Sequence, residues 1–185
     1  MPSIVGISGS LRKGSFNTAL LRAAAEAAPA GMTIDQRTIA GIPLYDGDVE
    51  AESGIPETVR DLKDRVAAAD GLLLVSPEYN NSIPGPFKNA IDWMTRPAKD
   101  IPRVFGKKIV AIMGASPGRG GTILSQNAWL PVLRTLGTCP WFGGRLMVSG
   151  ASKVFDASGN LVDDEVREQL KKFLAGFAGC FEKSR

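Results

Sequence analysis

Short apolar segments alternate with helical patterns along this whole chain, and that alternation restricts the fold more than any other feature. The clearest apolar segment runs from Gly71 to Ser76, with the sequence Gly-Leu-Leu-Leu-Val-Ser. A near-continuous apolar run of this length is typical of a strand buried on both faces of a parallel sheet. Parallel strands need long crossover connections, which are usually helices. The alternation therefore predicts an α/β fold with helices on both faces of a sheet.

The periodicity divides the chain into five strands and five helices. The strands are expected at residues 3–8, 32–39, 71–76, 107–114 and 145–149, the last with an alternative start near Pro140. The helices are expected at residues 17–28, 56–69, 87–94, 122–136 and 163–181. No repeat or linker divides the sequence, so residues 1–185 are expected to form a single doubly wound domain. Two strand orders fit this pattern, the dinucleotide-binding order and the order 2-1-3-4-5.

Composition excludes several kinds of chemistry. The chain of 185 residues contains no histidine, so it cannot use Ser-His-Asp or Cys-His catalysis or a histidine-ligated metal. Its two cysteines, Cys139 and Cys180, form no Cys-x-x-Cys motif, and no metal site is expected. A formal charge of +3 helps to attract anions but is too small for a nucleic-acid-binding surface. We find no signal peptide and no membrane span, and we expect a soluble cytoplasmic protein.

Ligands of doubly wound sheets bind at the carboxyl ends of the strands, so the loops that follow the strands hold the candidate site. The first loop, residues 8–17, combines small hydroxyl side chains with Arg12 just before a helix begins. Such a loop can direct N–H groups and hydroxyls at a phosphate. Gly9 and Gly14 have the spacing of a Walker A loop, but Ser15 replaces its lysine and excludes that motif. The alternative interpretation is a serine- and glycine-rich turn with a helix N-cap.

Two further loops carry polar or flexible residues after buried strands. Residues 77–86 place Glu78, Tyr79, Asn80 and Asn81 between prolines, which stiffen the loop. Residues 115–122 contain three glycines, which let a backbone pass close to a bulky ligand. Each loop alone can be interpreted as an ordinary turn. In the order 2-1-3-4-5, however, all three loops lie side by side, and together they suit a mononucleotide that carries a flat ring system.

The motifs in these loops resemble those of the NADPH-dependent FMN reductase family. They are residues 9–17 (Gly-Ser-Leu-Arg-Lys-Gly-Ser-Phe-Asn), residues 77–80 (Pro-Glu-Tyr-Asn) and residues 84–93 (Pro-Gly-Pro-Phe-Lys-Asn-Ala-Ile-Asp-Trp). The family includes bacterial NAD(P)H:quinone reductases that are also described as chromate reductases and azoreductases. The resemblance covers essentially the whole chain. It implies a flavodoxin-like fold with a five-stranded parallel sheet in the order 2-1-3-4-5, bound FMN, and a homodimer or homotetramer.

The resemblance also implies the cofactor-binding residues, one motif at a time. The FMN phosphate would be held by Ser10, Arg12, Ser15, Phe16 and Asn17. The isoalloxazine ring would be lined by Pro77, Glu78, Tyr79 and Asn80, and completed by Ser116, Gly118 and Gly120. No catalytic side chain is expected, because FMN itself carries the hydride chemistry.

The expected function is the transfer of two electrons from NAD(P)H to quinones, azo compounds or chromate. With no second nucleotide fingerprint, donor and acceptor would use one flavin face in turn, which gives ping-pong kinetics. Alternatives are an NAD(P)H-dependent reductase of free FMN, a flavodoxin-like electron carrier, and a flavin-binding scaffold without turnover. The net positive charge favours direct use of anionic NAD(P)H over the carrier. Trp93 and Met94 are expected in the core or at a subunit interface, with the interface favoured.

Overall fold

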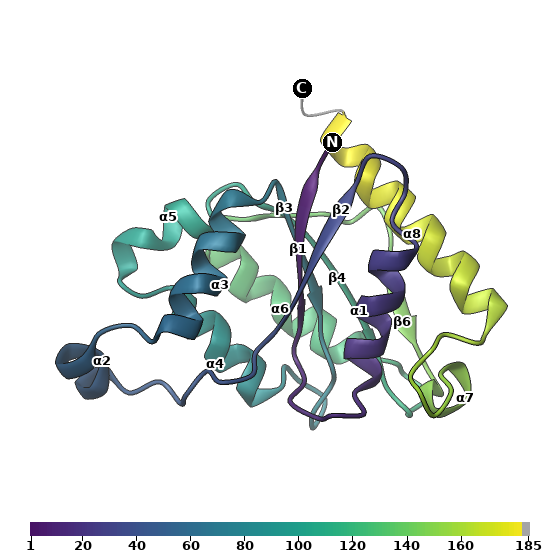
Figure 1. Ribbon diagram of the computed structural model, residues 1–185, viewed down its shortest axis with the longest axis horizontal. Helices are drawn as coiled ribbons and strands as arrows, with labels where there is room; N and C mark the ends of the chain where they lie inside the picture. The colour runs from purple at the N-terminus through teal and green to yellow at the C-terminus, as the bar shows by residue number, and fades with distance from the viewer. Residues whose placement is uncertain (183–185) are drawn as a thin grey trace.

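The computed structural model describes residues 1–182, and a parallel sheet forms the centre of the molecule (Figure 1). Its strand order is β2-β1-β3-β4-β5, and a further short strand, β6, also pairs with β4. This confirms the flavodoxin-like order. The strands are β1 (Ser3–Ser8), β2 (Thr33–Thr38), β3 (Gly71–Val75), β4 (Ile109–Ala115), β5 (Cys139–Pro140) and β6 (Leu146–Val148).

Helices cover both faces of this sheet. One face packs against α1 (Phe16–Glu26) and α8 (Asp164–Glu182), and the other packs against α3 (Glu57–Ala68), α4 (Gly85–Met94) and α6 (Ile123–Thr135). Four short helical segments complete the described chain: α2 (Gly47–Ser53), η1 (Ala98–Asp100), α5 (Ile101–Val104) and α7 (Ala151–Val154). No helix within residues 1–182 has both the length and the apolar character needed to cross a membrane.

Strand β3 shows why the sequence selects this layered arrangement. All of its residues are buried. Because successive side chains of a strand point to opposite faces, Leu73 and Val75 join the core beneath α1 and α8, while Leu72 and Leu74 join the core beneath α3, α4 and α6. An apolar run without polar interruptions is what a strand with two buried faces requires.

The fifth predicted strand is two short strands, which corrects the expectation for residues 145–149. β5 pairs with Ile109 and Val110 at the start of β4, and β6 pairs with residues 113–115 at its end. Between them Trp141 turns inward, and its indole packs against Phe173 with ring centroids 5.2 Å apart. The backbone N–H of Trp141 still donates to the Val110 carbonyl at 2.7 Å. The strand is therefore interrupted where the partly buried Trp141 side chain packs against the core.

The prediction of an interface position for Trp93 and Met94 is wrong, because both side chains are completely buried within the chain. The Trp93 indole N–H donates to the Pro43 carbonyl at 2.9 Å, and its ring packs edge-to-face against Tyr45 at 4.9 Å. These contacts anchor the segment that carries α2. That helix was not predicted, because none of its residues is buried and it therefore has no apolar stripe.

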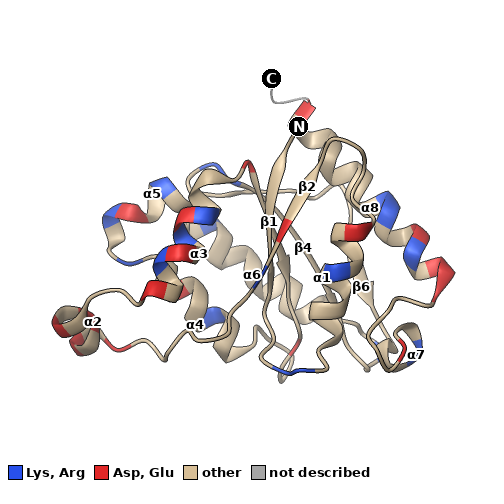
Figure 2. Ribbon diagram, in the orientation of Figure 1, with Lys and Arg blue, Asp and Glu red and all other residues tan. Residues whose placement is uncertain are grey.

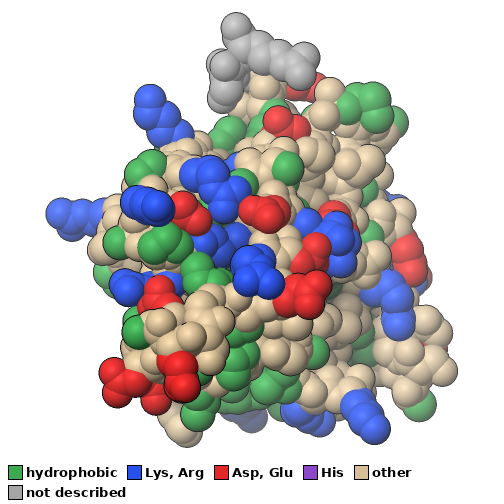
Figure 3. All heavy atoms as spheres, turned by 60° about the vertical axis from the view of Figure 1, so that its left-hand side comes forward, with side chains coloured by type: hydrophobic (Ala, Val, Ile, Leu, Met, Phe, Trp, Pro, Cys, Tyr) green, Lys and Arg blue, Asp and Glu red, His purple; other side chains and the backbone are tan. Residues whose placement is uncertain are grey.

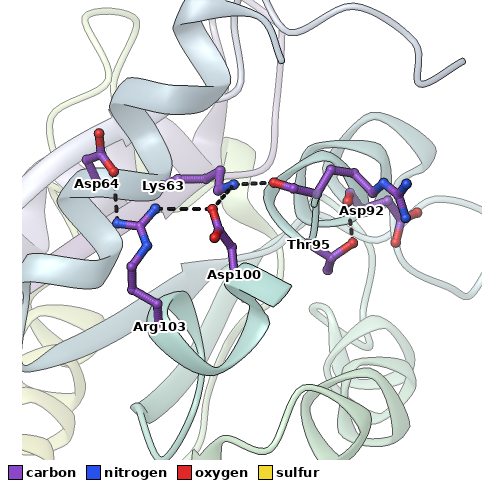
Figure 4. A network of polar contacts seen from close by, with 7 residues as sticks. Lys63, Asp64, Asp92, Thr95, Asp100 and Arg103 are labelled. Atoms are coloured by element: carbon purple, nitrogen blue, oxygen red, sulfur yellow. Dashed lines mark hydrogen bonds and ion pairs between the residues drawn. The ribbon is translucent and has the colours of Figure 1, made fainter. Parts of the chain in front are cut away.

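A buried lysine holds the connection between α4 and α5 against α3 (Figure 4). Lys63 is 2% exposed, and its ammonium donates to Asp100 Oδ2 at 2.8 Å and to the Arg96 carbonyl. Arg103 bridges Asp100 and Asp64, at 3.4 Å and 2.9 Å. The hydrogen bond from Lys63 lowers the pKa of Asp100 below its ordinary value, and Arg103 adds to that effect. A charged side chain is tolerated here because carboxylate and carbonyl oxygens compensate for its lost hydration.

Candidate functional site

The loops after β1, β3 and β4 meet at the carboxyl edge of the sheet and enclose a small hollow of about 70 Å³. It can enclose a group the size of a phosphate, and a larger ligand has to extend over the surface. The residues that line it are Ser10, Arg12, Ser15, Phe16, Asn17, Pro77, Glu78, Tyr79, Ala115, Ser116 and Pro117. Nine of the predicted residues are therefore brought together. Asn80, Gly118 and Gly120 belong to the same loops but do not line the hollow.

The first loop directs hydrogen-bond donors into this hollow. Ser15 is the N-cap of α1, and its hydroxyl oxygen accepts a hydrogen bond from the Thr18 N–H at 3.2 Å. The oxygen of Ser10 likewise accepts from the Arg12 N–H at 3.3 Å. In both cases the hydroxyl proton remains available to donate to a ligand. The N–H groups of the first turn of a helix have no partner within the helix, so α1 supplies further donors at Phe16 and Asn17.

The charge around the hollow suits an anion. Within residues 1–182, Arg12 forms no ion pair, and its side chain is exposed beside the helix N-terminus. The loop between β1 and α1 is blue at the lower edge of Figure 2. The partial positive charge of a helix N-terminus adds to that of the guanidinium. Buried hydroxyls, helix N–H groups and this arginine are together a donor set that fits a phosphate monoester.

The Asn17 side chain, which lines the hollow, also joins the first loop to the third. Its Nδ2 donates to the Ala115 carbonyl at 2.9 Å, and its Oδ1 accepts from the Ala115 N–H at 2.9 Å. Both functional groups of the amide are thus used to join α1 to the end of β4. The side chain therefore sets the position of the first loop relative to the third, while its second Nδ2–H and the Asn17 backbone N–H remain available to a ligand.

Glu78 also makes structural contacts that its sequence position does not reveal. Its Oε2 accepts hydrogen bonds from the N–H groups of Leu124 and Ser125, at 2.8 Å and 3.0 Å. These donors lie in the first turn of α6, whose N-cap residue Thr122 makes no side-chain cap. A carboxylate at a helix N-terminus is stabilised by the helix dipole. Glu78 therefore joins the second loop to α6 at the wall of the hollow.

The second loop ends in a tight turn. The backbone N–H and carbonyl of Tyr79 bond to the carbonyl and N–H of Ser82, at 3.2 Å and 3.0 Å. Asn80 and Asn81, between them, have φ of 49° and 63°, which is the left-handed pair of a type I′ turn. Asparagine is one of the few residues that tolerate this conformation. The turn leaves Tyr79 exposed at the rim, with its backbone held rigidly.

The third loop is folded around Ser116. The Ser116 hydroxyl donates to the Gly121 carbonyl at 2.6 Å and accepts from the Gly118 N–H at 3.2 Å. Gly121 has a φ of +59°, and a Cβ there would lie 2.9 Å from the Met147 backbone. Glycine is therefore required at residue 121, whereas a Cβ at Gly118 or Gly120 would make only ordinary contacts, the nearest at 3.5 Å and 3.8 Å. The lining residues Ala115 and Pro117 were missed, because neither carries a polar side chain that marks a site.

Comparison with known proteins places the sequence among flavin-dependent reductases. The profile of a family described as NADPH-dependent FMN reductase matches residues 2–153. An NAD(P)H-dependent FMN reductase of Pseudomonas aeruginosa is 44% identical over 171 residues, covering 92% of this chain and 90% of that protein. A 2-hydroxy-1,4-benzoquinone reductase of a Burkholderia species is 38% identical over 182 residues, covering 98% and 97%.

A solved structure supports the same grouping. FerB, a flavoenzyme NAD(P)H:acceptor oxidoreductase from Paracoccus denitrificans, superimposes with a TM-score of 0.86 at 32% identity, and the match covers 99% of this chain and 98% of that one. Similarity over nearly the full length of both chains means that the sheet, its order and the three loops belong to a shared architecture.

Proposed function

Because the chain belongs to the NADPH-dependent FMN reductase family, we propose that it transfers two electrons from NAD(P)H to quinone-like acceptors with FMN as its cofactor. The net reaction is NAD(P)H + H⁺ + quinone → NAD(P)⁺ + hydroquinone, in which the H⁺ comes from water. The observation that carries this proposal is the hollow in which the loops after β1, β3 and β4 meet. FMN, when bound, supplies the hydride-accepting and hydride-donating chemistry.

We assign the phosphate of FMN to the first loop. The hydroxyls of Ser10 and Ser15 donate, the first N–H groups of α1 point the same way, and Arg12 supplies the charge. The second loop, at Tyr79 and Asn80, and the third loop, from Ser116 to Gly120, would hold the flat ring of FMN. In that arrangement the rigid turn after Tyr79 would support the ring on one side, and one ring face would remain accessible to substrates.

The first test of this assignment concerns Arg12. Replacing Arg12 by alanine removes a charge-assisted hydrogen bond, so we expect FMN affinity to fall about ten- to a hundred-fold. Lys13→Ala is the matched control, because Lys13 is also exposed and cationic but does not line the hollow. The measurement is fluorescence titration of the apoprotein with FMN at low and high salt. Equal effects of the two variants would show that only net charge attracts the cofactor.

The second test concerns turnover. If one accessible ring face serves donor and acceptor in turn, double-reciprocal plots of NAD(P)H oxidation at several benzoquinone concentrations should be parallel. The acceptors to compare are benzoquinone, an azo dye and chromate. Intersecting plots would refute the proposal that donor and acceptor share one ring face. If no acceptor supports NAD(P)H oxidation, the protein is not a reductase, and an electron carrier or a flavin-binding scaffold is favoured instead.

The small volume of the hollow favours a second candidate function, which is the reduction and release of FMN. A ligand that is enclosed only at its phosphate can leave without movement of the protein. The relative from Pseudomonas aeruginosa is named for reduction of FMN. Gel filtration after anaerobic reduction with NADPH separates the two functions. Flavin that elutes with the protein supports the quinone reductase, and flavin that elutes separately supports the FMN reductase.

A further inference from the structure

Two exposed cations lie beside the hollow on its third-loop side. Arg119 belongs to the third loop and Lys153 to α7. Within residues 1–182, neither makes an ion pair or a side-chain hydrogen bond. Other exposed cations of residues 1–182 do meet carboxylates, as Arg65 does with Asp61 at 2.8 Å and Lys171 with Glu168 at 2.7 Å.

The segments that carry these two cations form one continuous ledge. The Ala151 N–H donates to the Ser116 carbonyl at 3.0 Å, and the Gly150 N–H donates to the Gly118 carbonyl at 3.3 Å. Lys153 follows in the same turn, because its N–H donates to the Gly150 carbonyl at 2.9 Å. Arg119 is the next residue after Gly118. The two side chains therefore start from two segments that are hydrogen-bonded to one another through Ser116, Gly118, Gly150 and Ala151.

The ledge is also fixed to the wall of the hollow. Phe155, which follows α7, stacks against Phe16 with ring centroids 5.9 Å apart and an angle of 26°. Phe16 lines the hollow and begins α1. Arg119 and Lys153 thus sit on a rigid border of the candidate site, on the side of the third loop. They are separate from Ser10, Arg12 and Ser15, which serve the phosphate of FMN in the proposed function.

Charge is distributed unevenly along this edge of the molecule. In Figure 2, α2 and α7 lie at opposite ends of the lower edge, with the loop between β1 and α1 between them. Helix α2 and its N-cap carry four carboxylates: Asp46, Asp48, Glu50 and Glu52. Figure 3 shows acidic side chains gathered low on the face that α2 occupies. An anion that arrives at the hollow is repelled from the α2 end and attracted towards the ledge.

We propose that Arg119 and Lys153 bind a phosphate group of the reducing dinucleotide. This inference rests on the proposed function, in which the nicotinamide ring stacks on the accessible flavin face beside the third loop. The rest of the dinucleotide must then extend out of the hollow, and the ledge is the cationic surface next to that exit. NADH and NADPH share two phosphates, and NADPH carries a third on its ribose. The ledge accordingly binds either the shared pyrophosphate or the additional phosphate.

The experiment uses the FMN-loaded protein and the double variant Arg119→Ala/Lys153→Ala. The matched control is Arg134→Ala/Lys172→Ala, which removes one arginine and one lysine that are also exposed and make no ion pair within residues 1–182. Arg134 lies at the far end of α6, about 16 Å along the helix from its start. Isothermal titration calorimetry with the non-reducing ligands NADP⁺ and NAD⁺ measures binding without turnover.

We expect the double variant to weaken NADP⁺ binding about ten-fold at low salt, and less at high salt, while the control changes it less than two-fold. Equal losses for NAD⁺ and NADP⁺ assign the ledge to the shared pyrophosphate, and a loss confined to NADP⁺ assigns it to the ribose phosphate. Unchanged binding of both ligands, or equal losses in variant and control, overturns the proposal. If the ledge proposal fails in this way, the proposed function can still be checked separately. It stands if the wild-type protein contains FMN and if NADPH reduces that FMN.

Discussion

Replacing Asn17 by leucine is expected to lower the free energy of unfolding by about 2–5 kcal/mol and to weaken FMN binding at the same time. Leucine has a similar size, so it excludes water while leaving both the N–H and the carbonyl of Ala115 without the bonds that the amide provides at 2.9 Å. An unsatisfied buried polar group costs about 1–3 kcal/mol. Loss of this link also frees the first loop to shift relative to the third.

Urea unfolding of the apoprotein gives the stability, and fluorescence titration gives the FMN affinity. Asn127→Leu is the control, because Asn127 is exposed on α6 and such substitutions change stability by about 0.5 kcal/mol or less. If Asn17→Leu keeps wild-type stability and loses only FMN, the side chain contacts the cofactor and is not a structural link. If it keeps both, the link to Ala115 is unimportant.

Gly9→Ala is the second substitution with a large expected effect. A Cβ at this position would lie 2.0 Å from Cδ1 and 2.5 Å from Cγ of the Phe87 ring. That ring cannot yield, because Phe87 is completely buried and packs edge-to-face on Trp129 at 5.0 Å. Overpacking of a core costs about 1–3 kcal/mol, and sometimes more. The first loop must move instead, so we expect a lower melting temperature together with weaker FMN binding.

The chain offers a matched control and a rescue for this prediction. Gly14 lies in the same loop, and a Cβ added there would meet no described atom within 4 Å, so Gly14→Ala should change stability by about 0.5 kcal/mol or less. Phe87→Leu gives the alanine room. The double variant Gly9→Ala/Phe87→Leu should therefore be more stable than the sum of the single losses predicts, by about 0.5–3 kcal/mol. Strict additivity would show that the clash is not with Phe87.

Much of the fold could be predicted, because the patterns that specify its helices and strands lie within short continuous segments of sequence. The apolar run of β3 and the helical spacing of α3 or α8 each follow from burial of a continuous stretch of residues. Helix α2 escaped prediction because it packs no side chain into the core. One signal was present: Asp46 is an N-cap, and its carboxylate accepts from the Asp48 N–H at 2.9 Å. A capping residue that is not followed by an apolar stripe is too weak a signal to predict a helix on its own.

The site was predictable in outline but not in the roles of its residues. Strand order brings three loops together, so polar residues after β1, β3 and β4 had to be neighbours. The contacts of Asn17 with Ala115 and of Glu78 with Leu124 span 98 and 46 residues of sequence. No local pattern reports which of these side chains faces a ligand and which joins two loops. Their polarity suggested binding, and each side chain also makes hydrogen bonds that join two loops of the protein.

The interruption between β5 and β6 has a consequence for how these molecules behave when concentrated. An exposed edge strand with a continuous row of free backbone groups is a template for pairing between molecules. One edge of this sheet is divided in two, with the inward turn at Trp141 where a longer strand would continue. The opposite edge, β2, carries Asp35 and Arg37, paired at 2.7 Å. Neither border presents a long uncharged strand, so the sheet is protected against edge-to-edge aggregation at both ends.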